Sequence, residues 1–320
     1  MSPTLQDIQQ AAERIKPYAH RTPVMTNESL NKRVGAQVYL KCENFQKVGA
    51  FKFRGACNAV YALSDEEAAR GVCTHSSGNH AQALALAAKL RGIPAYIVMP
   101  NNASSVKKNA VAGYGGQITF CEPTLEARES AMERIRLATR ATVVHPYDNE
   151  RVIAGQGTAT LELLEDVLDL DVIISPVGGG GLISGTSIAA TEMKKGIRVI
   201  AGEPEMADDA YRSVKAGEII PPVNPKTIAD GLLTSLGTLT FPIIQNCVEQ
   251  IVTVSEAGII ESMKFIWERA KIVIEPSAAV AVGVLWEKKI DLTGLKVGVI
   301  LSGGNVDLEK LPWYRKGDPT

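Results

Sequence analysis

The sequence predicts an α/β protein of two lobes, each built on a doubly wound parallel sheet. Three observations indicate this fold class: short β-branched runs alternate with helical patterns from residue 71, no hairpin turn signals separate the runs, and the alternation comes in two series. Strands that alternate with helices are typical of parallel sheets joined by crossover helices. Such sheets bind ligands at the carboxyl ends of their strands, so we expect an active cleft between the lobes.

The first series of elements covers residues 72–147. Its expected strands are VCTH (72–75), AYIVMP (95–100), QITFCE (117–122) and TVVHPY (142–147), and its expected helices lie within residues 81–92, 104–115 and 124–141. Each helical pattern is long enough to cross over between parallel strands. We expect these elements to form a small domain of residues 66–148.

The second series begins with the helical pattern GTATLELLEDV (157–167). It continues with the strand DVIISPV (171–177), a helix within 182–196 and the strand RVIAGEP (198–204). After a Pro-rich interruption at 218–231 come the strand QIVTVSE, two helices around 267–289 and a last strand, KVGVILS (296–302). The residues near 1–65 are expected to pack with this series, which predicts a discontinuous large domain of residues 1–65 and 149–320.

Composition and charge are those of a soluble globular protein. Lys+Arg 34 against Asp+Glu 35 gives a net charge of −1, which excludes a basic face for nucleic acid or an anionic membrane. Apolar runs such as DVIISPV are far too short to span a bilayer, and the N-terminal pattern lacks a signal-peptide core. Five widely spaced cysteines without a CxxC pair indicate reduced thiols. We therefore expect a cytoplasmic protein.

The glycine-rich stretch PVGGGGLISG (176–185) carries the clearest chemical signal. Four consecutive glycines are entropically costly, which is tolerated where the backbone must approach a ligand closely. The stretch follows an apolar strand and opens a helix, so its free N–H groups suit a phosphate. Its spacing matches neither the dinucleotide fingerprint nor the P-loop. A phosphate outside a nucleotide is the preferred ligand, and an ordinary tight turn is the alternative.

Two further loops and one lysine complete the candidate site. VILSGGN (299–305) places Ser302 at the carboxyl end of a strand, where ligands bind in such sheets. THSSGNH (74–80) offers hydroxyls, backbone amides and the side chain of Asn79, which suit a carboxylate and a phenol oxygen of a ligand. Either loop alone is also compatible with a simple helix N-cap. Lys52 stands between Phe51 and Phe53, where a strongly hydrated cation is costly unless it has a use. A snorkelling surface lysine is the alternative.

These segments, taken in order, resemble a known family. GAFKFRGA (49–56), SSGNH, the tetraglycine loop and SGGN resemble the fold-type II pyridoxal phosphate (PLP) enzymes, which have a tryptophan synthase β-like fold with the cofactor between the lobes. Within them the chain is most similar to the serine racemase and serine/threonine dehydratase group, which includes threo-3-hydroxyaspartate dehydratases. KCENFQK, HPYD, IAGQGT, EMADD, IADG and EPSAAV extend the similarity over essentially the whole chain. One departure is Ala50, where many relatives have a serine.

The resemblance implies roles in cofactor binding. Lys52 would form the Schiff base with the cofactor aldehyde, and an apolar pocket that lowers its pKa would favour the neutral amine. The implied cofactor-binding residues are Lys52, Phe51, Asn79, Gly178, Gly179, Gly180, Gly181 and Ser302. The glycines would hold the phosphate, Asn79 the ring oxygen and Ser302 the pyridine nitrogen, while Phe51 packs against the ring. A neutral hydroxyl at that nitrogen favours elimination over transamination.

The resemblance also implies a substrate loop and a second acid–base group. The substrate-binding residues would be Ser76, Ser77, Gly78, Asn79, His80 and Arg128. Ser77 resembles the residue that acts opposite the lysine in serine racemases, so Lys52 and Ser77 are the expected catalytic pair. The alternative for Ser77 is a loop-capping serine that touches the substrate carboxylate. Arg128 would suit a second carboxylate, and the alternative is a solvated helix face.

The stretch AGEPEMADDA (201–210) offers hard oxygen ligands for Mg²⁺, Ca²⁺ or Mn²⁺. Spacing alone favours a solvated acidic helix start. The resemblance favours a structural divalent-cation site at Glu203, the carbonyl of Ala207 and Asp209.

The residues and the resemblance together predict a PLP-dependent serine racemase and serine/threonine ammonia-lyase (dehydratase). It would remove the α-proton of a small β-hydroxy amino acid, eliminate water to give a 2-oxo acid and ammonia, and racemise serine. One alternative is threo-3-hydroxyaspartate ammonia-lyase as the main activity, and another is a β-replacement enzyme of the cysteine or cystathionine synthase type. More distant alternatives are a nicotinamide dehydrogenase and a non-catalytic nucleotide-binding module. The resemblance further suggests a homodimer, with ATP as an activator in some relatives.

Overall fold

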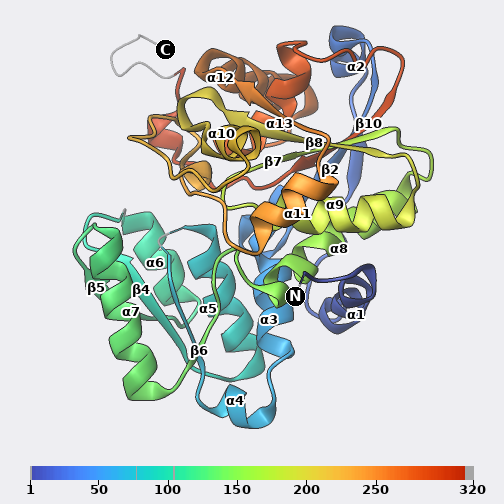
Figure 1. Cartoon of the computed structure of the whole chain (residues 1–320). Coiled ribbons are helices and arrows are strands. Elements are labelled where there is room, and N and C mark those ends of the chain that lie inside the picture. Colours follow the sequence, from blue (N-terminus) through green and yellow to red (C-terminus); the bar gives the residue numbers. More distant parts are fainter. Residues whose placement is uncertain (1, 77, 104, 314–320) are drawn as a thin grey trace.

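The computed structural model describes residues 2–76, 78–103 and 105–313, without the side chains of residues 106 and 125. The chain folds into two lobes around two separate sheets (Figure 1). The lower lobe in that view holds the strands coloured cyan to green, and the upper lobe combines the blue N-terminal strands with those of the second half of the chain.

The larger sheet joins strands from distant parts of the sequence. Its order is β1-β2-β10-β7-β8-β9, with bounds Val24–Thr26, Gln37–Cys42, Lys296–Leu301, Val172–Pro176, Arg198–Pro204 and Gln250–Val254. All neighbouring strands pair in parallel except β1 and β2, which are antiparallel. The expected parallel sheet is therefore confirmed with one antiparallel edge strand, β1, which helix α2 connects to β2.

The smaller sheet has the order β5-β4-β3-β6, and all of its pairs are parallel. Its strands are Gln117–Cys121, Ala95–Pro100, Val72–His75 and Thr142–Val143. All four therefore lie between residues 72 and 143, and all six strands of the larger sheet lie outside that stretch. The domain boundaries at 65/66 and 148/149 stay a prediction.

The helices cover the faces of the two sheets. Those before residue 145 are α1 Leu5–Ile15, α2 Glu28–Val34, α3 Lys52–Tyr61, α4 Asp65–Ala69, α5 Asn79–Arg91, α6 Ser105–Gly113 and α7 Leu125–Thr139. Those after it are α8 Glu150–Asp166, α9 Gly181–Met193, α10 Asp209–Ala216, α11 Thr240–Cys247, α12 Glu256–Phe265 and α13 Pro276–Trp286. Local signals set their ends: the Asn149 side chain accepts from Val152 N and begins α8, and Gly92 ends α5 in the left-handed conformation.

Glycines allow α3 and α9 to pack very closely on α8. A Cβ atom on Gly155 would lie 2.6 Å from the backbone oxygen of Arg54, and one on Gly185 would lie 2.5 Å from the backbone nitrogen of Gly157. Such contacts are too short for any side chain, so only glycine permits the approach. Because α3 begins at Lys52 and α9 follows the glycine loop, packing of both helices on α8 fixes the position of Lys52 relative to the glycine loop.

A buried ionic network also holds α3 in place. Arg54 is fully buried and donates to Glu43 Oε2 at 2.7 Å and to Glu162 Oε1 at 2.7 Å. Lys41, also fully buried, donates to Glu162 Oε2 at 2.6 Å. Two cations and two carboxylates balance, and the paired geometry offsets the cost of removing these charges from water.

Among the described residues, no helix combines the length and the apolar character needed to cross a membrane.

Candidate active site

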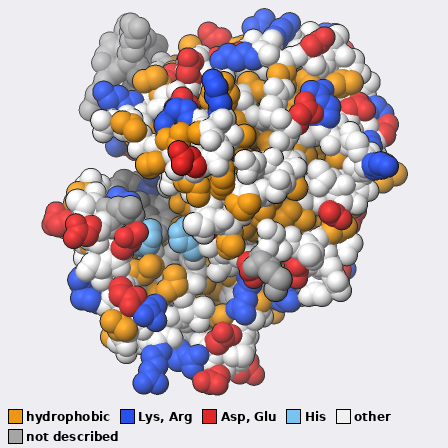
Figure 2. All heavy atoms as spheres, viewed as in Figure 1, with side chains coloured by type: hydrophobic (Ala, Val, Ile, Leu, Met, Phe, Trp, Pro, Cys, Tyr) orange, Lys and Arg blue, Asp and Glu red, His pale blue; other side chains and the backbone are white. Residues whose placement is uncertain are grey.

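Three of the expected site segments lie at the carboxyl ends of strands. Ser302 follows β10, the glycine loop follows β7, and the SSGNH segment follows β3. Figure 2 shows a hollow between the lobes with histidine side chains in it. Parallel sheets present ligand sites at this edge, so the two sheets meet around one cleft.

Lys52 is partly buried at the first position of α3. Its Nζ donates to the backbone oxygen of Pro146 at 2.8 Å and lies 5.0 Å from the centre of the Phe51 ring. Burial lowers the pKa of Lys52 to about 8, and the nearby carboxylate of Glu275 opposes this shift. The neutral amine that a nucleophile or base requires is therefore far more populated near neutral pH than in an ordinary lysine.

The tetraglycine loop forms a backbone surface without side chains at the start of α9. Gly180 has φ +91°, and the first helical hydrogen bond runs from Ser184 N to Gly180 O at 2.9 Å. The N–H groups of the first turn precede that bond and have no helical partner. A Cβ atom on Gly178 would lie 3.0 Å from Leu232 Cα, and one on Gly179 would lie 2.3 Å from the Tyr147 ring. These two contacts show that the loop packs closely on the protein's own residues. Its free N–H groups, with the positive end of the helix dipole behind them, are of the kind that suits an anion.

Asn79, at the start of α5, is held across the cleft by residues of the other lobe. Its Nδ2 donates to Glu275 Oε1 at 3.0 Å, and its Oδ1 accepts from Asn305 Nδ2 at 2.9 Å. Ser302 is buried beside them, and its backbone oxygen accepts from Phe51 N at 2.9 Å. The structure therefore brings Lys52, Asn79 and Ser302 together around one space.

Glu275 is a residue of this site to which the sequence analysis assigned no role. It is 5% exposed, and burial raises its pKa to about 7, while the hydrogen bond from Asn79 opposes the shift. The sequence feature that could have indicated a role for Glu275 is its position within the apolar run KIVIEPSAAVAV, where a buried carboxylate needs a hydrogen-bond or ionic partner.

Three histidines surround the cleft on the small-lobe side. His80, expected in the substrate loop, is buried, and its Nε2 contacts the backbone oxygen of Val144 at 2.9 Å. His75 is the last residue of β3 and His145 lies two residues after the end of the neighbouring strand β6, with ring centres 6.3 Å apart. Burial lowers the pKa of His80 to about 3 and that of His145 to about 4. Sequence reasoning missed His75 and His145, although both stand at the ends of expected strands.

The remaining substrate residues are only partly placed. Ser77 lies outside the described residues, so its predicted role is not tested. Ser76 is partly buried, and its Oγ accepts from Gly78 N at 3.3 Å. Arg128 lies on α7 with a buried Nε that has no hydrogen-bond partner among the described residues. Burial lowers the pKa of His75, the charge of Glu129 opposes this shift and the charge of Arg128 adds to it, so both charged side chains lie within electrostatic range of His75.

The expected metal ligands lie at the end of β8, in the turn after it and at the start of α10. Glu203 and Asp209 are each 1% exposed, and Ala207 lies in the turn between them. Glu203 accepts from Ala210 N at 2.7 Å and from Tyr211 N at 2.8 Å, whereas both oxygens of Asp209 have no hydrogen-bond partner among the described residues. Burial raises the pKa of Glu203 to about 8 and that of Asp209 to about 7.

A buried carboxylate without partners is expensive, and a bound cation would satisfy it. These residues therefore fit a divalent cation. Within the described chain no group of three or more His, Cys, Asp or Glu side chains is placed to hold a metal, so backbone oxygens and water would complete the ligand set.

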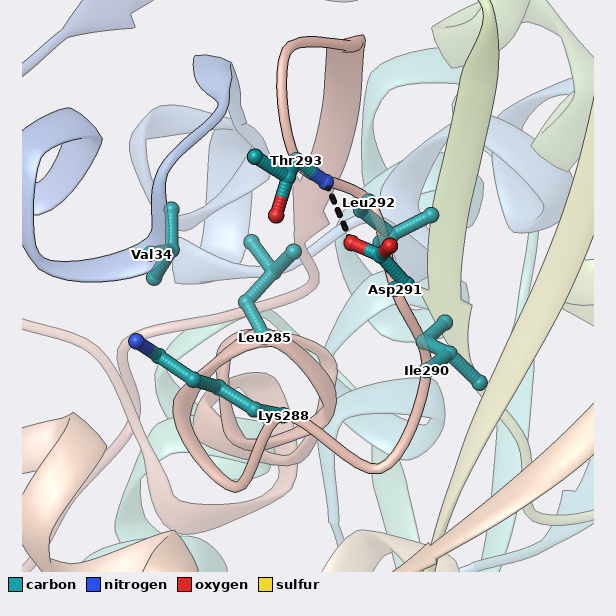
Figure 3. Close-up of a pocket in the computed structure, with 7 residues that line it drawn as sticks. All are labelled: Val34, Leu285, Lys288, Ile290, Asp291, Leu292 and Thr293. Carbon is teal, nitrogen blue, oxygen red and sulfur yellow. Dashed lines mark hydrogen bonds between the residues drawn. The ribbon is translucent and has the colours of Figure 1, made fainter.

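Figure 3 shows a cavity of about 220 Å³ that is not part of this cleft. It is lined by Val34, Leu285, Lys288, Ile290, Asp291, Leu292 and Thr293. Thr293 N donates to Asp291 Oδ1 at 3.0 Å, so this carboxylate caps the loop before β10. None of the expected site residues lines the cavity.

Comparison with known proteins identifies the family. A family model described as "Pyridoxal-phosphate dependent enzyme" matches residues 15–303. The chain belongs to this family. It is 53% identical over 311 residues to the beta-hydroxyaspartate dehydratase of Paracoccus denitrificans, covering 97% of this chain and 99% of that one. It is 52% identical over 314 residues to the serine racemase of Dictyostelium discoideum, covering 96% of each. The crystal structure of the Dictyostelium serine racemase superposes with a TM-score of 0.92 over 96% of this chain and 100% of that chain.

The cleft residues fit the cofactor of the pyridoxal-phosphate dependent enzymes. A partly buried amine with a lowered pKa, a side-chain-free anion site at a helix N-terminus and a fixed Asn79 match the aldehyde, phosphate and ring oxygen of pyridoxal phosphate. The resemblance, the fold class and this cofactor are therefore confirmed. The family match also excludes the nicotinamide dehydrogenase and nucleotide-module alternatives.

Proposed function

We propose that this pyridoxal-phosphate dependent enzyme is a serine racemase and a serine/threonine ammonia-lyase acting on small β-hydroxy amino acids. The observation that carries the proposal is the amine of Lys52, with its pKa lowered to about 8, at the entrance of α3 and beside the glycine cradle. Relatives with about half of their residues identical are named serine racemase and beta-hydroxyaspartate dehydratase. The expected activities follow from this combination.

Each cleft residue has a task that its surroundings support. Pyridoxal phosphate, when bound, supplies the electron sink that stabilises negative charge at the substrate α-carbon. Lys52 would take the α-proton, because burial lowers its pKa to about 8 and so raises the share of neutral amine near neutral pH. The glycine loop would bind the phosphate, and Asn79 would bind the ring oxygen while Glu275 and Asn305 hold its amide in place.

Ser302 and Phe51 would set the environment of the cofactor ring. Ser302 would face the ring nitrogen with a neutral hydroxyl, and Phe51 would pack on the ring face. A neutral partner stabilises the α-carbon charge less than a carboxylate does, so loss of the β-hydroxyl competes well with transamination. The backbone hydrogen bond from Phe51 N to Ser302 O, at 2.9 Å, fixes the position of these two residues relative to each other.

Ser77 would provide the second acid–base group that racemisation requires. A planar α-carbon needs a proton donor on each face to invert, whereas elimination from an L-substrate needs only one. Lys52 would serve one face and Ser77 the other. Elimination of water from L-serine therefore needs no Ser77 hydroxyl, and inversion does.

A panel of substrates tests the proposal on the wild-type enzyme and on Ser77→Ala. L-serine, D-serine, L-threonine and L-threo-3-hydroxyaspartate are scored for 2-oxo acid and for the inverted amino acid. We expect wild-type enzyme to form oxo acid and to invert serine, and Ser77→Ala to lose inversion and action on D-serine while it retains L-serine elimination. Absence of both products from every substrate would reject the proposed function. If Ser77→Ala loses inversion and L-serine elimination by the same modest factor, Ser77 only caps the loop.

L-threo-3-hydroxyaspartate is the second candidate substrate, and Arg128 favours it. The buried Nε of Arg128 has no hydrogen-bond partner among the described residues, and Arg128 lies within electrostatic range of His75. A guanidinium in this position suits the second carboxylate of the substrate. In Arg128→Met, hydroxyaspartate turnover should fall far more than serine turnover; equal losses would remove this assignment.

A divalent cation at Glu203, Ala207 O and Asp209 would have a structural role. It would neutralise two buried carboxylates whose raised pKa values show the cost of their charge. Mg²⁺, Ca²⁺ and Mn²⁺ all suit oxygen ligands. The homodimer, the activation by ATP, the cytoplasmic location and the absence of nucleic-acid and membrane partners stay predictions.

A further inference from the structure

His75 and His145 leave the small sheet side by side at the edge that faces the cleft. Strands β3 and β6 are parallel neighbours, with Cys73 opposite Val143. Two residues further on, the imidazole rings of His75 and His145 meet edge to face, with centres 6.3 Å apart and planes at 83°. This is the edge of an open α/β sheet where ligands bind, so either ring is placed to meet a substrate.

His145 is the ring that lies next to the catalytic lysine. The following residue, Pro146, accepts the hydrogen bond from Lys52 Nζ at 2.8 Å. On its other side the His145 ring meets the Tyr147 ring at 4.6 Å, and Tyr147 packs against Gly179 of the glycine loop. His145 therefore directly precedes the residue that contacts the proposed base, and its ring contacts the tyrosine that packs on the glycine loop.

The hydrogen bonds of His145 fix which nitrogen carries its proton. Nδ1 accepts from Asp148 N at 2.9 Å and from Tyr147 N at 3.4 Å. An imidazole nitrogen that accepts hydrogen bonds carries no hydrogen, so the proton of the neutral ring is on Nε2. A cationic ring would direct a second N–H at these two backbone donors. The ring of His145 is thus held neutral, with its N–H group at Nε2, on the side away from the backbone of Tyr147 and Asp148. This Nε2 forms no hydrogen bond within the described chain.

His80 has the opposite arrangement and cannot take this role. Its Nε2 donates to the backbone oxygen of Val144, which leaves a buried Nδ1 that can only accept.

We propose that His145 donates a hydrogen bond from Nε2 to the oxygen on the β-carbon of the substrate and thereby assists its departure. The proposal rests on the proposed ammonia-lyase function. In the elimination, Lys52 Nζ takes the α-proton, the C–H electron pair becomes the Cα=Cβ bond, and the Cβ–O pair leaves with the oxygen. That oxygen takes a proton from Lys52 Nζ and leaves as water, which returns the amine to its neutral form. His145 keeps its own proton and stabilises the charge that develops on the oxygen.

Two variants separate this role from a structural one. In His145→Asn the side-chain oxygen can still accept from Asp148 N and Tyr147 N, but nothing reaches the Nε2 position. In His145→Gln the amide nitrogen reaches that position, while the acceptor for the turn is lost. A role confined to the turn predicts that Asn is the better replacement, and a donor to the substrate predicts that Gln retains more elimination activity.

The holoenzymes are assayed on L-serine and on β-chloro-L-alanine, whose chloride leaves without a hydrogen-bond donor. We expect His145→Asn to lower kcat/KM for L-serine elimination by about 100- to 1000-fold and that for β-chloro-L-alanine far less. His145→Gln should recover part of the L-serine activity despite a lower melting temperature. Equal losses on both substrates, or an unchanged L-serine rate in His145→Asn, would overturn the proposal.

Imidazole ¹⁵N NMR of the wild-type holoenzyme gives a readout that needs no turnover. The Nε2–H tautomer of His145 is expected, and an Nδ1–H tautomer or an imidazolium at neutral pH would overturn the proposal. A wild-type enzyme that releases chloride but eliminates no water from any β-hydroxy amino acid would reject the proposed function instead.

Discussion

At the residue scale, two opposing effects set the reactivity of Lys52. Burial lowers its pKa to about 8, and the carboxylate of Glu275 acts in the opposite direction. Glu275 is itself buried with a pKa raised to about 7, so it is largely ionised where Lys52 titrates. The same carboxylate accepts from Asn79 and thereby links the position of the ring-oxygen ligand to the charge state of the lysine.

The rate at which pyridoxal phosphate attaches covalently to the apoenzyme should report this pKa. Only the neutral amine reacts, so the rate should rise with pH through about 8 and then level off. Glu275→Gln removes a negative charge that favours the ammonium, so the midpoint should move to lower pH. Stopped-flow absorbance of the visible cofactor band measures both. Glu261→Gln, at an exposed carboxylate that accepts from Trp286, serves as control. A midpoint that stays fixed or rises in Glu275→Gln would contradict this account.

At the element scale, the position of Lys52 depends on how α3 is held between its neighbours. Glycines permit the contact of α3 with α8, and the Arg54 network ties the first turn of α3 to β2 and α8. All three donor nitrogens of the Arg54 guanidinium are occupied, by Glu43, Glu162 and neighbouring oxygens. A lysine ammonium cannot reproduce the planar arrangement of guanidinium donors, so a lysine at this position would leave a carboxylate with fewer hydrogen bonds.

Arg54→Met should therefore be strongly destabilising. It leaves Glu43 buried without its cation, and the loss of one partner from a buried pair costs about 3–5 kcal/mol. Arg54→Lys should fall between Arg54→Met and wild type. Urea unfolding measures the free energy of each, with Arg136→Met as the matched surface control because Arg136 pairs with Glu133 in solvent. An Arg54→Met variant no less stable than Arg136→Met would show that the network contributes nothing.

The elements themselves were largely predictable, whereas their long-range contacts were not. VCTH and AYIVMP form β3 and β4 with the expected bounds, because alternating apolar runs and helical patterns are local signals. The strand β1 was not predicted: three residues carry too little pattern, and its antiparallel pairing depends on β2. Lys52, Asn79 and Ser302 were singled out from their loops and apolar surroundings, and the resemblance supplied their specific roles. The partnership of Glu275 with Asn79 joins residues 196 positions apart, so no local pattern could indicate it.

At the scale of the whole molecule, two buried acidic sites have different partners. Glu275 is satisfied by Asn79 and Asn305 N across the cleft. Asp209 lies far along the chain from the cleft loops, at the start of α10, and its carboxylate has no hydrogen-bond partner among the described residues. A protein that encloses an unpartnered carboxylate is destabilised as a whole unless a ligand binds there, so metal binding and global stability should be coupled.

Removal of divalent cations should therefore lower the melting temperature, and added Mg²⁺ should restore it. A ligand that binds only the folded state raises its stability in proportion to the logarithm of ligand concentration, so the shift should grow with Mg²⁺ until other events limit it. Asp209→Asn keeps the shape of the side chain but removes the charge, so its melting temperature should respond little to chelator or Mg²⁺. Asp208→Asn is the matched control, because Asp208 is the adjacent acid and already pairs with Arg212 at 2.8 Å. Thermal unfolding of the three proteins after exhaustive chelation, with and without Mg²⁺, decides the matter. The proposed cation site is wrong if the melting temperature of the wild-type enzyme does not respond to chelation. It is also wrong if the melting temperature of Asp208→Asn responds to chelator and Mg²⁺ as little as that of Asp209→Asn, and these acids then only begin a helix.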